Sequence, residues 1–169
     1  HRARSDPAMP CWAKSPIKFS VSSALPATIP SLTGVSTPSL GEICLQSPQF
    51  CRTLLPDVRK FVFCGEVMTC RLGEQMLSRF PGAHIYNAYG PTETTVLVTA
   101  VEVTGEMCAG QTSLPIGYGF SNLECRILDP DTREPLPDGR EGKLAIVGDC
   151  VSPGYFRRPE QTARAFFTD

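Results

Sequence analysis

The residues best suited to chemistry lie in one short segment, Asn87-Ala88-Tyr89-Gly90-Pro91-Thr92-Glu93. Tyr89 offers a flat ring to an adenine base, and Gly90-Pro91 forces a tight turn that exposes backbone groups. Thr92 offers a hydroxyl to a phosphate oxygen, and Glu93 offers a carboxylate suited to Mg²⁺, which proteins hold with carboxylates and phosphate oxygens. The segment is therefore a candidate nucleotide and metal site, although the same residues are also typical of a solvated turn.

Two predicted strands and a helix must position this segment. Residues 60–64 (KFVFC) form a short, almost wholly apolar run, which is typical of a strand buried on both faces. Residues 69–80 carry apolar side chains on one helical face, and residues 83–87 form a second strand. This unit predicts two parallel strands with a right-handed crossover. The candidate segment then lies just beyond the second strand, where open α/β sheets bind ligands.

The segments before this unit are less regular. Residues 36–38 (STP) supply helix N-cap candidates and a proline for the first turn, and Leu40, Ile43 and Cys44 then recur at helical spacing. Short strands are expected near residues 18–21 and 32–35. The high density of proline in residues 1–35 prevents any longer element there.

The segments after it are rich in strand-forming residues. Residues 95–103 (TVLVTAVEV) predict a long strand, and residues 123–128 and 143–147 predict two more. Residues 129–139 favour a hairpin turn over a calcium loop, because prolines break the spacing of ion ligands. Residues 159–167 predict a final short helix.

These elements predict an α/β fold in which a parallel-sheet βαβ portion is followed by a β-rich subdomain. Residues 1–35 form a Pro/Ser-rich segment whose structure the sequence does not determine. Residues 36–93 form the α/β part, and residues 94–169 form the β-rich part with its terminal helix.

Composition limits the possible partners. The 169 residues include 16 Lys and Arg against 17 Asp and Glu, a net charge of −1 that argues against nucleic acid as a partner. No apolar run reaches the length of a membrane helix, so no membrane insertion is expected. The eight cysteines lack metal-site spacing and are predicted to be free thiols of a cytoplasmic protein. With only His1 and His84 as histidines, a zinc site is not expected.

Three motifs, in this order, resemble the adenylate-forming (AMP-binding) superfamily, which includes acyl-CoA synthetases and nonribosomal peptide adenylation domains. The segment 87–93 is similar to the family signature, and residues 114–117 (LPIG) are similar to a short segment that follows it. Residues 142–148 (GKLAIVG), 151–155 (VSPGY) and 159–166 (PEQTARAF) resemble the next family motif, with Lys143 where the family usually has Glu. The resemblance covers about residues 35–169.

Finer details resemble one group of this superfamily, the D-alanine:carrier-protein ligases. They lie in residues 36–39 (STPS), 54–56 (LLP), 63–66 (FCGE) and 113–115 (SLP). Peptide-synthetase domains more often have Gly-Gly-Glu where this chain has Cys64-Gly65-Glu66. The resemblance implies activation of D-alanine with ATP and transfer to the phosphopantetheine thiol of a carrier protein, for the D-alanylation of lipoteichoic acid.

The resemblance also implies a role for each matched residue. The ATP site would be lined by Asn87, Ala88, Tyr89, Gly90, Pro91 and Thr92, with Tyr89 against adenine and Thr92 on the α-phosphate. Glu93 would bind Mg²⁺, so Thr92 and Glu93 would carry the catalytic roles. Gly65 and Glu66 would form the other wall of the adenine slot. Cys64 and Val96 would border a side-chain pocket small enough for alanine, although each residue type is also common in an ordinary core.

Other parts of the family pattern have no counterpart in the 169 residues. These are the phosphate loop with its lysine, the aspartate that would hold the substrate ammonium, and the catalytic lysine of the C-terminal domain. We therefore expect an internal fragment of a longer ligase that cannot complete adenylation alone. A fragment of a nonribosomal peptide synthetase and a non-catalytic nucleotide-binding remnant are the alternatives.

Overall fold

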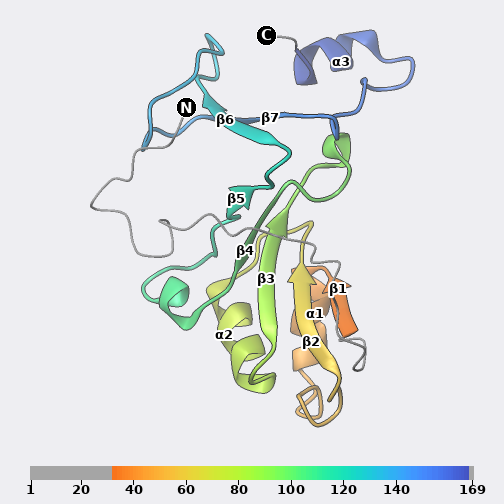
Figure 1. Ribbon diagram of the computed structural model, residues 1–169, viewed down its shortest axis with the longest axis vertical. Helices are drawn as coiled ribbons and strands as arrows, with labels where there is room; N and C mark the ends of the chain where they lie inside the picture. Colours follow the sequence, from red (N-terminus) through yellow and green to blue (C-terminus); the bar gives the residue numbers. More distant parts are fainter. Residues whose placement is uncertain (1–31, 168–169) are drawn as a thin grey trace.

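Three neighbouring parallel strands form one side of the main sheet. The computed structural model describes residues 32–167. A five-stranded sheet has the order β1-β2-β3-β4-β5 (Figure 1), with bounds Leu32–Ser36, Val58–Phe63, His84–Tyr89, Thr99–Glu102 and Tyr118–Gly119. The strands β1, β2 and β3 pair in parallel, and β4 and β5 are added antiparallel. The parallel pairing of β2 with β3 confirms the predicted βαβ unit, and β1 confirms the strand expected near residues 32–35.

Two capped helices connect the parallel strands. Helix α1 (Pro38–Leu45) begins after Thr37, whose side chain accepts a hydrogen bond from the Leu40 amide. Helix α2 (Cys70–Arg79) begins after Thr69, whose side chain accepts from the Leu72 amide. A side-chain oxygen at this position satisfies one of the otherwise unpaired amides of the first turn. Both helices were predicted from the sequence, and their N-caps explain where they start.

The residues that α1 buries are not the apolar residues that recur at helical spacing in the sequence. Leu40 and Ile43 are 52% and 61% exposed, whereas Pro38, Gly41 and Leu45 are buried. A Cβ at Gly41 would lie 2.7 Å from Phe63 Cε1, so only glycine lets the helix approach the sheet this closely. The helix therefore packs through Pro38, Gly41 and Leu45 rather than through Leu40 and Ile43.

The core lies between these helices and one face of the sheet. Phe61 and Phe63 point to the helices, and the centres of the Phe61 and Phe80 rings are 4.6 Å apart. On the other face of β2, Lys60 is exposed and Val62 is only partly buried. The prediction that residues 60–64 are buried on both faces was wrong, because among residues 32–167 the helices that contact this strand cover one face.

The strand predicted at residues 95–103 is much shorter. Only Thr99–Glu102 forms β4, whereas Thr92–Thr94 forms a short 3₁₀ turn. Thr95 and Val96 adopt the left-handed region with φ of 60° and 78°. Tyr89 pairs antiparallel with Thr99, so the chain must reverse direction between them. The reversal overrides the β-propensity of the intervening residues.

A second, smaller sheet lies at the other end of the molecule (Figure 1). Strands β6 (Glu124–Leu128) and β7 (Lys143–Val147) pair antiparallel, and helix α3 (Pro159–Ala165) follows. The Asp129 carboxylate accepts hydrogen bonds from the amides of Asp131 and Thr132, both at 2.9 Å. These elements confirm the predicted hairpin and the terminal helix.

Other sequence predictions concern cysteines, membranes and the first residues. Cysteines 44, 51, 64, 70, 108, 125 and 150 are free thiols. In the described part of the chain, no helix is long and apolar enough to cross a membrane. The strand expected near residues 18–21 lies outside the described residues.

Candidate functional site

The candidate residues follow the same ends of neighbouring strands. Parallel register pairs Ser36 of β1 with Phe63 of β2, and Phe63 with Asn87 of β3. Residues 64–66 therefore emerge beside residues 88–90, at one edge of the sheet. The expectation that β3 ends at Asn87 was wrong, since the strand continues to Tyr89. Only residues 90–93 of the candidate segment lie beyond the strand.

Asn87 fixes the backbone around the site. Its side chain is buried, and its Nδ2 atom donates to the carbonyl of Pro115 at 2.8 Å and, more weakly, to that of Leu114 at 3.5 Å. The amide thus ties the segment 87–93 to the LPIG segment. Ala88 is also buried, whereas Tyr89 at the end of β3 is 37% exposed. The tyrosine ring is therefore the part of this strand end that a ligand can reach.

Gly90 and Pro91 begin the reversal toward β4. A Cβ at Gly90 would lie 2.2 Å from the Val96 carbonyl oxygen, so no other residue fits here without moving the backbone. The Thr94 amide and hydroxyl both donate to the Pro91 carbonyl, at 3.0 and 3.1 Å. Thr92, at the start of this 3₁₀ turn, is exposed.

Glu93 is oriented by a residue distant in the sequence. Its carboxylate accepts a hydrogen bond from the Tyr155 hydroxyl, and its backbone carbonyl accepts from the Ser152 amide at 2.7 Å. The Tyr155 hydrogen bond lowers the pKa of the Glu93 carboxyl below its ordinary value. Sequence reasoning alone misses Tyr155 as a site residue, although its place in the VSPGY motif is a signal for it.

Thr95 and Val96 hold an unusual backbone conformation beside the site. A left-handed φ is rare for a β-branched residue and is costly unless neighbouring contacts hold it. The Thr95 hydroxyl donates to the Cys150 carbonyl at 3.1 Å, which supplies such a contact. The Val96 side chain is 61% exposed.

The loop after β2 is fastened to helix α1. Cys64 is partly buried, and its amide donates to the Ser36 carbonyl at 3.1 Å. Gly65 has φ of +89°, which glycine adopts without strain. The Glu66 carboxylate accepts from both the amide and the hydroxyl of Ser39, and these bonds lower its pKa. Ser39 belongs to the STPS segment, but its contact with Glu66 is visible only in the folded chain.

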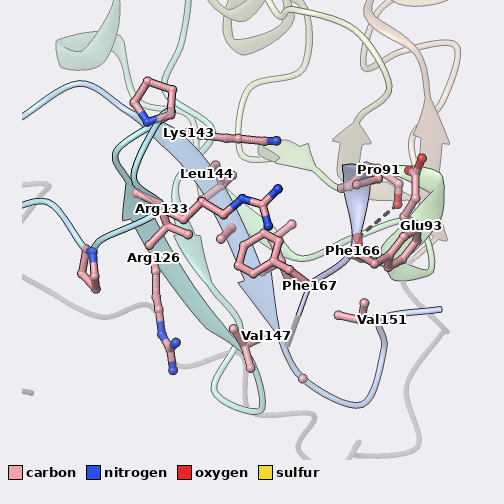
Figure 2. A pocket seen from close by; sticks show the side chains of 18 of the residues that line it. Pro91, Glu93, Arg126, Arg133, Lys143, Leu144, Val147, Val151, Phe166 and Phe167 are labelled. Carbon is pink, nitrogen blue, oxygen red and sulfur yellow. Dashed lines mark hydrogen bonds between the residues drawn. The ribbon is translucent and has the colours of Figure 1, made fainter. Parts of the chain in front are cut away.

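A cavity of about 810 Å³ lies between the β6–β7 sheet and the segment after α3 (Figure 2). It is lined by the cationic side chains of Arg126, Arg133 and Lys143 and by an apolar wall that includes Phe167. The Arg133 guanidinium lies 5.0 Å from the centre of the Phe167 ring. The cavity meets the candidate segment at Pro91 and Glu93, and the next residue, Thr94, also lines it, while Tyr89 and the Gly65–Glu66 loop do not. The predicted walls of the adenine slot therefore lie outside this cavity.

The donor set at residues 92–93 suits a magnesium–phosphate group. A carboxylate with a lowered pKa is ionised at neutral pH, and Mg²⁺ in proteins is commonly held by one or two carboxylates and by phosphate oxygens. The exposed Thr92 hydroxyl is next in the chain and can donate to such an oxygen. The residues present therefore fit the ion that the sequence predicted.

Comparison with known proteins supports the same family. A family model described as AMP-binding enzyme matches residues 31–156 of the chain. The chain belongs to this family. The match confirms the predicted superfamily, and it spans the strand ends, the reversal and the β6–β7 sheet described above.

Curated relatives show which group within the family the chain resembles. The chain is 44% identical over 133 residues to a D-alanine--D-alanyl carrier protein ligase of Listeria welshimeri, covering 79% of the chain and 26% of the relative. It is 45% identical over 144 residues to the protein of the same name from Lactiplantibacillus plantarum, covering 85% and 28%. The chain therefore spans about a quarter of the length of these relatives.

Solved structures confirm the fold class. The Vibrio cholerae adenylation domain AlmE, in complex with glycyl-adenosine-5'-phosphate, is 31% identical with a TM-score of 0.68, covering 81% of this chain and 26% of that one. ATP-bound MatB from Rhodopseudomonas palustris is 26% identical with a TM-score of 0.65, covering 80% and 25%. The α/β sheet followed by a small β-rich part is thus that of adenylate-forming enzymes.

Proposed function

We propose that the strand ends 64–66 and 87–93 form the ATP site of an AMP-forming ligase. The observation that carries the proposal is the parallel register of Phe63 with Asn87, which brings the Gly65–Glu66 loop beside Tyr89. Both the loop and the tyrosine ring are exposed, so an adenine base can lie between them. The likeness to ATP-bound MatB supports ATP as the ligand.

The phosphates would lie toward residues 92 and 93. Thr92 would donate its hydroxyl to the α-phosphate, and Glu93, oriented by Tyr155, would hold Mg²⁺. The metal, when bound, neutralises phosphate charge as pyrophosphate departs. The chain's own residues supply positioning and preorganised donors, which are the main requirements of this reaction.

We propose D-alanine as the acyl donor and a carrier-protein thiol as the acceptor. A carboxylate oxygen of the amino acid attacks the α-phosphorus, and the bond to pyrophosphate breaks. The phosphopantetheine thiol of the carrier then attacks the carbonyl carbon, and AMP leaves. Two relatives named as D-alanine--D-alanyl carrier protein ligases support this choice, and lipoteichoic acid is the proposed final acceptor.

The proposed amino-acid pocket is bordered by Cys64 and Val96. Both side chains are small and lie beside the proposed adenine walls, Cys64 after β2 and Val96 in the reversal after β3. The glycyl adenylate in the AlmE complex shows that a relative of this fold holds a small amino acid. Such a pocket would have room for alanine and would exclude larger side chains.

Binding of Mg²⁺-ATP to the 169-residue chain tests the nucleotide site. Calorimetric titration is expected to show saturable binding, and Tyr89→Ala is expected to weaken it at least about fivefold, because aromatic stacking contributes roughly 1–3 kcal/mol per base. Phe156→Ala, which truncates an aromatic side chain that is 85% exposed and is not one of the proposed adenine walls, is the control. Absence of binding would reject the site.

A chimera tests the reaction. The segment of the Listeria welshimeri relative that matches this chain is replaced by the chain's own residues, and ATP–pyrophosphate exchange is measured across amino acids. Exchange stimulated by D-alanine is expected, whereas the isolated chain should give none. Preference for a bulky L-amino acid would favour the peptide-synthetase alternative, and no exchange despite ATP binding would favour a non-catalytic remnant.

A further inference from the structure

The loop after β2 is held at its two ends and its middle by one short stretch of chain. The Cys64 amide donates to the Ser36 carbonyl at 3.1 Å. The amide of Ser39 donates to Glu66 Oε2 at 3.0 Å, and the Ser39 hydroxyl donates to the same oxygen. The Thr69 hydroxyl donates to the Glu42 carboxylate at 3.4 Å. Residues 36–42 therefore hold residues 64, 66 and 69, while the Met68 carbonyl accepts from the Leu114 amide at 2.9 Å.

The hydrogen bonds between Ser39 and Glu66 are the decisive ones, because packing does not hold the exposed residues 65–67. Gly65, Glu66 and Val67 are all exposed, and Val67 reaches 73%. The nearest atom to a Cβ built on Gly65 is Thr37 Cγ2, at 4.0 Å. A glycine with φ of +89° has wide conformational freedom, so an exposed loop around it needs a fixed partner. Ser39 is that partner.

The same contact determines where the Glu66 carboxylate points. It accepts an amide and a hydroxyl from the first turn of α1, where unpaired amides and the helix dipole favour a negative charge. These hydrogen bonds therefore orient the carboxylate toward the helix. The surface that residues 65–66 offer to a ligand beside Tyr89 is then their backbone.

We propose that Ser39 is a positioning residue of the adenine site: through Glu66, it fixes the Gly65–Glu66 backbone as a rigid wall. The inference rests on the proposed function, since it assigns the wall to a nucleotide base. It adds a residue outside the strand-end motifs and assigns a structural task to the Glu66 carboxylate. Ser39 itself does not touch the nucleotide.

Two ligands separate a positioning role from a general loss of structure. ATP contains the base that the wall contacts, whereas inorganic tripolyphosphate contains only the phosphate chain. Ser39→Ala is expected to raise the Kd for Mg²⁺-ATP roughly tenfold, as for loss of a hydrogen bond to a charged group, and to leave the Kd for tripolyphosphate within about twofold. Glu66→Gln should raise the Kd for ATP in the same way.

Conservative and remote variants complete the design. Ser39→Thr keeps the hydroxyl and is expected to restore ATP binding, and Ser78→Ala, on the exposed surface of α2, should leave both ligands unaffected. In Ser39→Ala, the NMR-monitored pKa of the Glu66 carboxyl should rise part of the way toward its ordinary value, because the variant removes the Ser39 hydroxyl, the largest cause of its lowering, and keeps the Ser39 amide. Combining Ser39→Ala with Glu66→Gln should add little to either single change.

Failure of the proposed function and failure of the role of Ser39 give different results. If the unmodified chain does not bind ATP, the proposed function fails and the role of Ser39 at a nucleotide fails with it. If the chain binds ATP and Ser39→Ala leaves that affinity unchanged, only the positioning role is rejected. An equal loss of ATP and tripolyphosphate binding would also reject it, because the effect would then be general.

Discussion

Glu93 and Tyr155 illustrate how the site is built at the scale of single residues. The two side chains come from motifs that are far apart in the chain, and one hydrogen bond joins them. Asn87 is likewise committed to the Leu114 and Pro115 carbonyls, and Glu66 to Ser39. Polar groups of the candidate site thus fix one another in place before any ligand arrives, which lowers the cost of ordering them later.

Tyr155→Phe tests the coupling between these motifs. Removal of the hydroxyl should raise the pKa of the Glu93 carboxyl toward its ordinary value, because the Tyr155 hydrogen bond is the main cause of its lowering. A lowered folded-state pKa contributes stability above the unfolded-state pKa and loses it as the pH falls through the folded-state value. The variant should therefore lose less stability on acidification.

The measurement is an NMR titration of the Glu93 side chain together with urea unfolding at several pH values. Tyr86→Phe is the matched control, because its hydroxyl donates to Glu102 rather than to Glu93. An unchanged Glu93 titration in Tyr155→Phe would show that the hydroxyl does not determine the ionisation of this carboxyl.

The cysteines permit a second prediction at this scale. Backbone amides of Thr53 and Leu54 lower the pKa of the Cys51 thiol, whereas burial, with a smaller contribution from the nearby Cys70, raises the pKa of Cys108 to about 11. Thiolate is the reactive form, so iodoacetamide near pH 7.5 should modify Cys51 well before Cys108. Peptide mass spectrometry over time measures the order. Equal rates in the folded chain would contradict the prediction, and equal rates in urea serve as the control.

At the scale of elements, the sequence predicts strands and helices well but not their surroundings. The strand β2, both long helices and the β6–β7 hairpin follow from apolar runs, caps and turn residues that act locally. The exposed Leu40 and Ile43 and the shortened β4 do not, because they depend on contacts distant in the sequence. The site follows the same rule: the segment 87–93 is a local motif, whereas the contacts of Ser39 with Glu66 and of Tyr155 with Glu93 join motifs that are distant in the sequence.

Gly41→Ala tests the packing of α1 against the sheet. A methyl group there would lie 2.7 Å from the Phe63 ring, which is nearly fully buried and has little room to move. Overpacking of this kind costs about 1–3 kcal/mol, and that loss should outweigh the better helix propensity of alanine. Urea unfolding measures the free energy.

The matched control is Gly105→Ala, because a Cβ at Gly105 would have no atom within 4 Å. That variant should stay within about 0.5 kcal/mol of the original chain. A Gly41→Ala chain as stable as the control would mean that α1 shifts without cost and that its close approach to Phe63 is not required.

For the whole molecule, burial is distributed unevenly between its two ends. The core cluster consists of residues from the five-stranded sheet, the two long helices and their connections. In β6 and β7 only Leu128 is buried, and α3 has no buried residue. The contacts of Glu93 and Thr95 with residues 150–155 link the two ends. A two-stranded sheet with so little buried surface is marginally stable by itself.

Amide hydrogen exchange should therefore separate the two ends. The amides of β2 and β3 are expected to exchange at least about tenfold more slowly than those of β6 and β7, after correction for intrinsic rates, because they open only when the core opens. Met76→Ala, which creates a core cavity costing roughly 2–5 kcal/mol, should accelerate β2 and β3 and leave β6 and β7 nearly unchanged. Ile146→Ala in β7 should do the opposite. If Met76→Ala accelerated all four strands equally, the two ends would unfold as one cooperative unit, and the links through Glu93 and Thr95 would be as strong as the core itself.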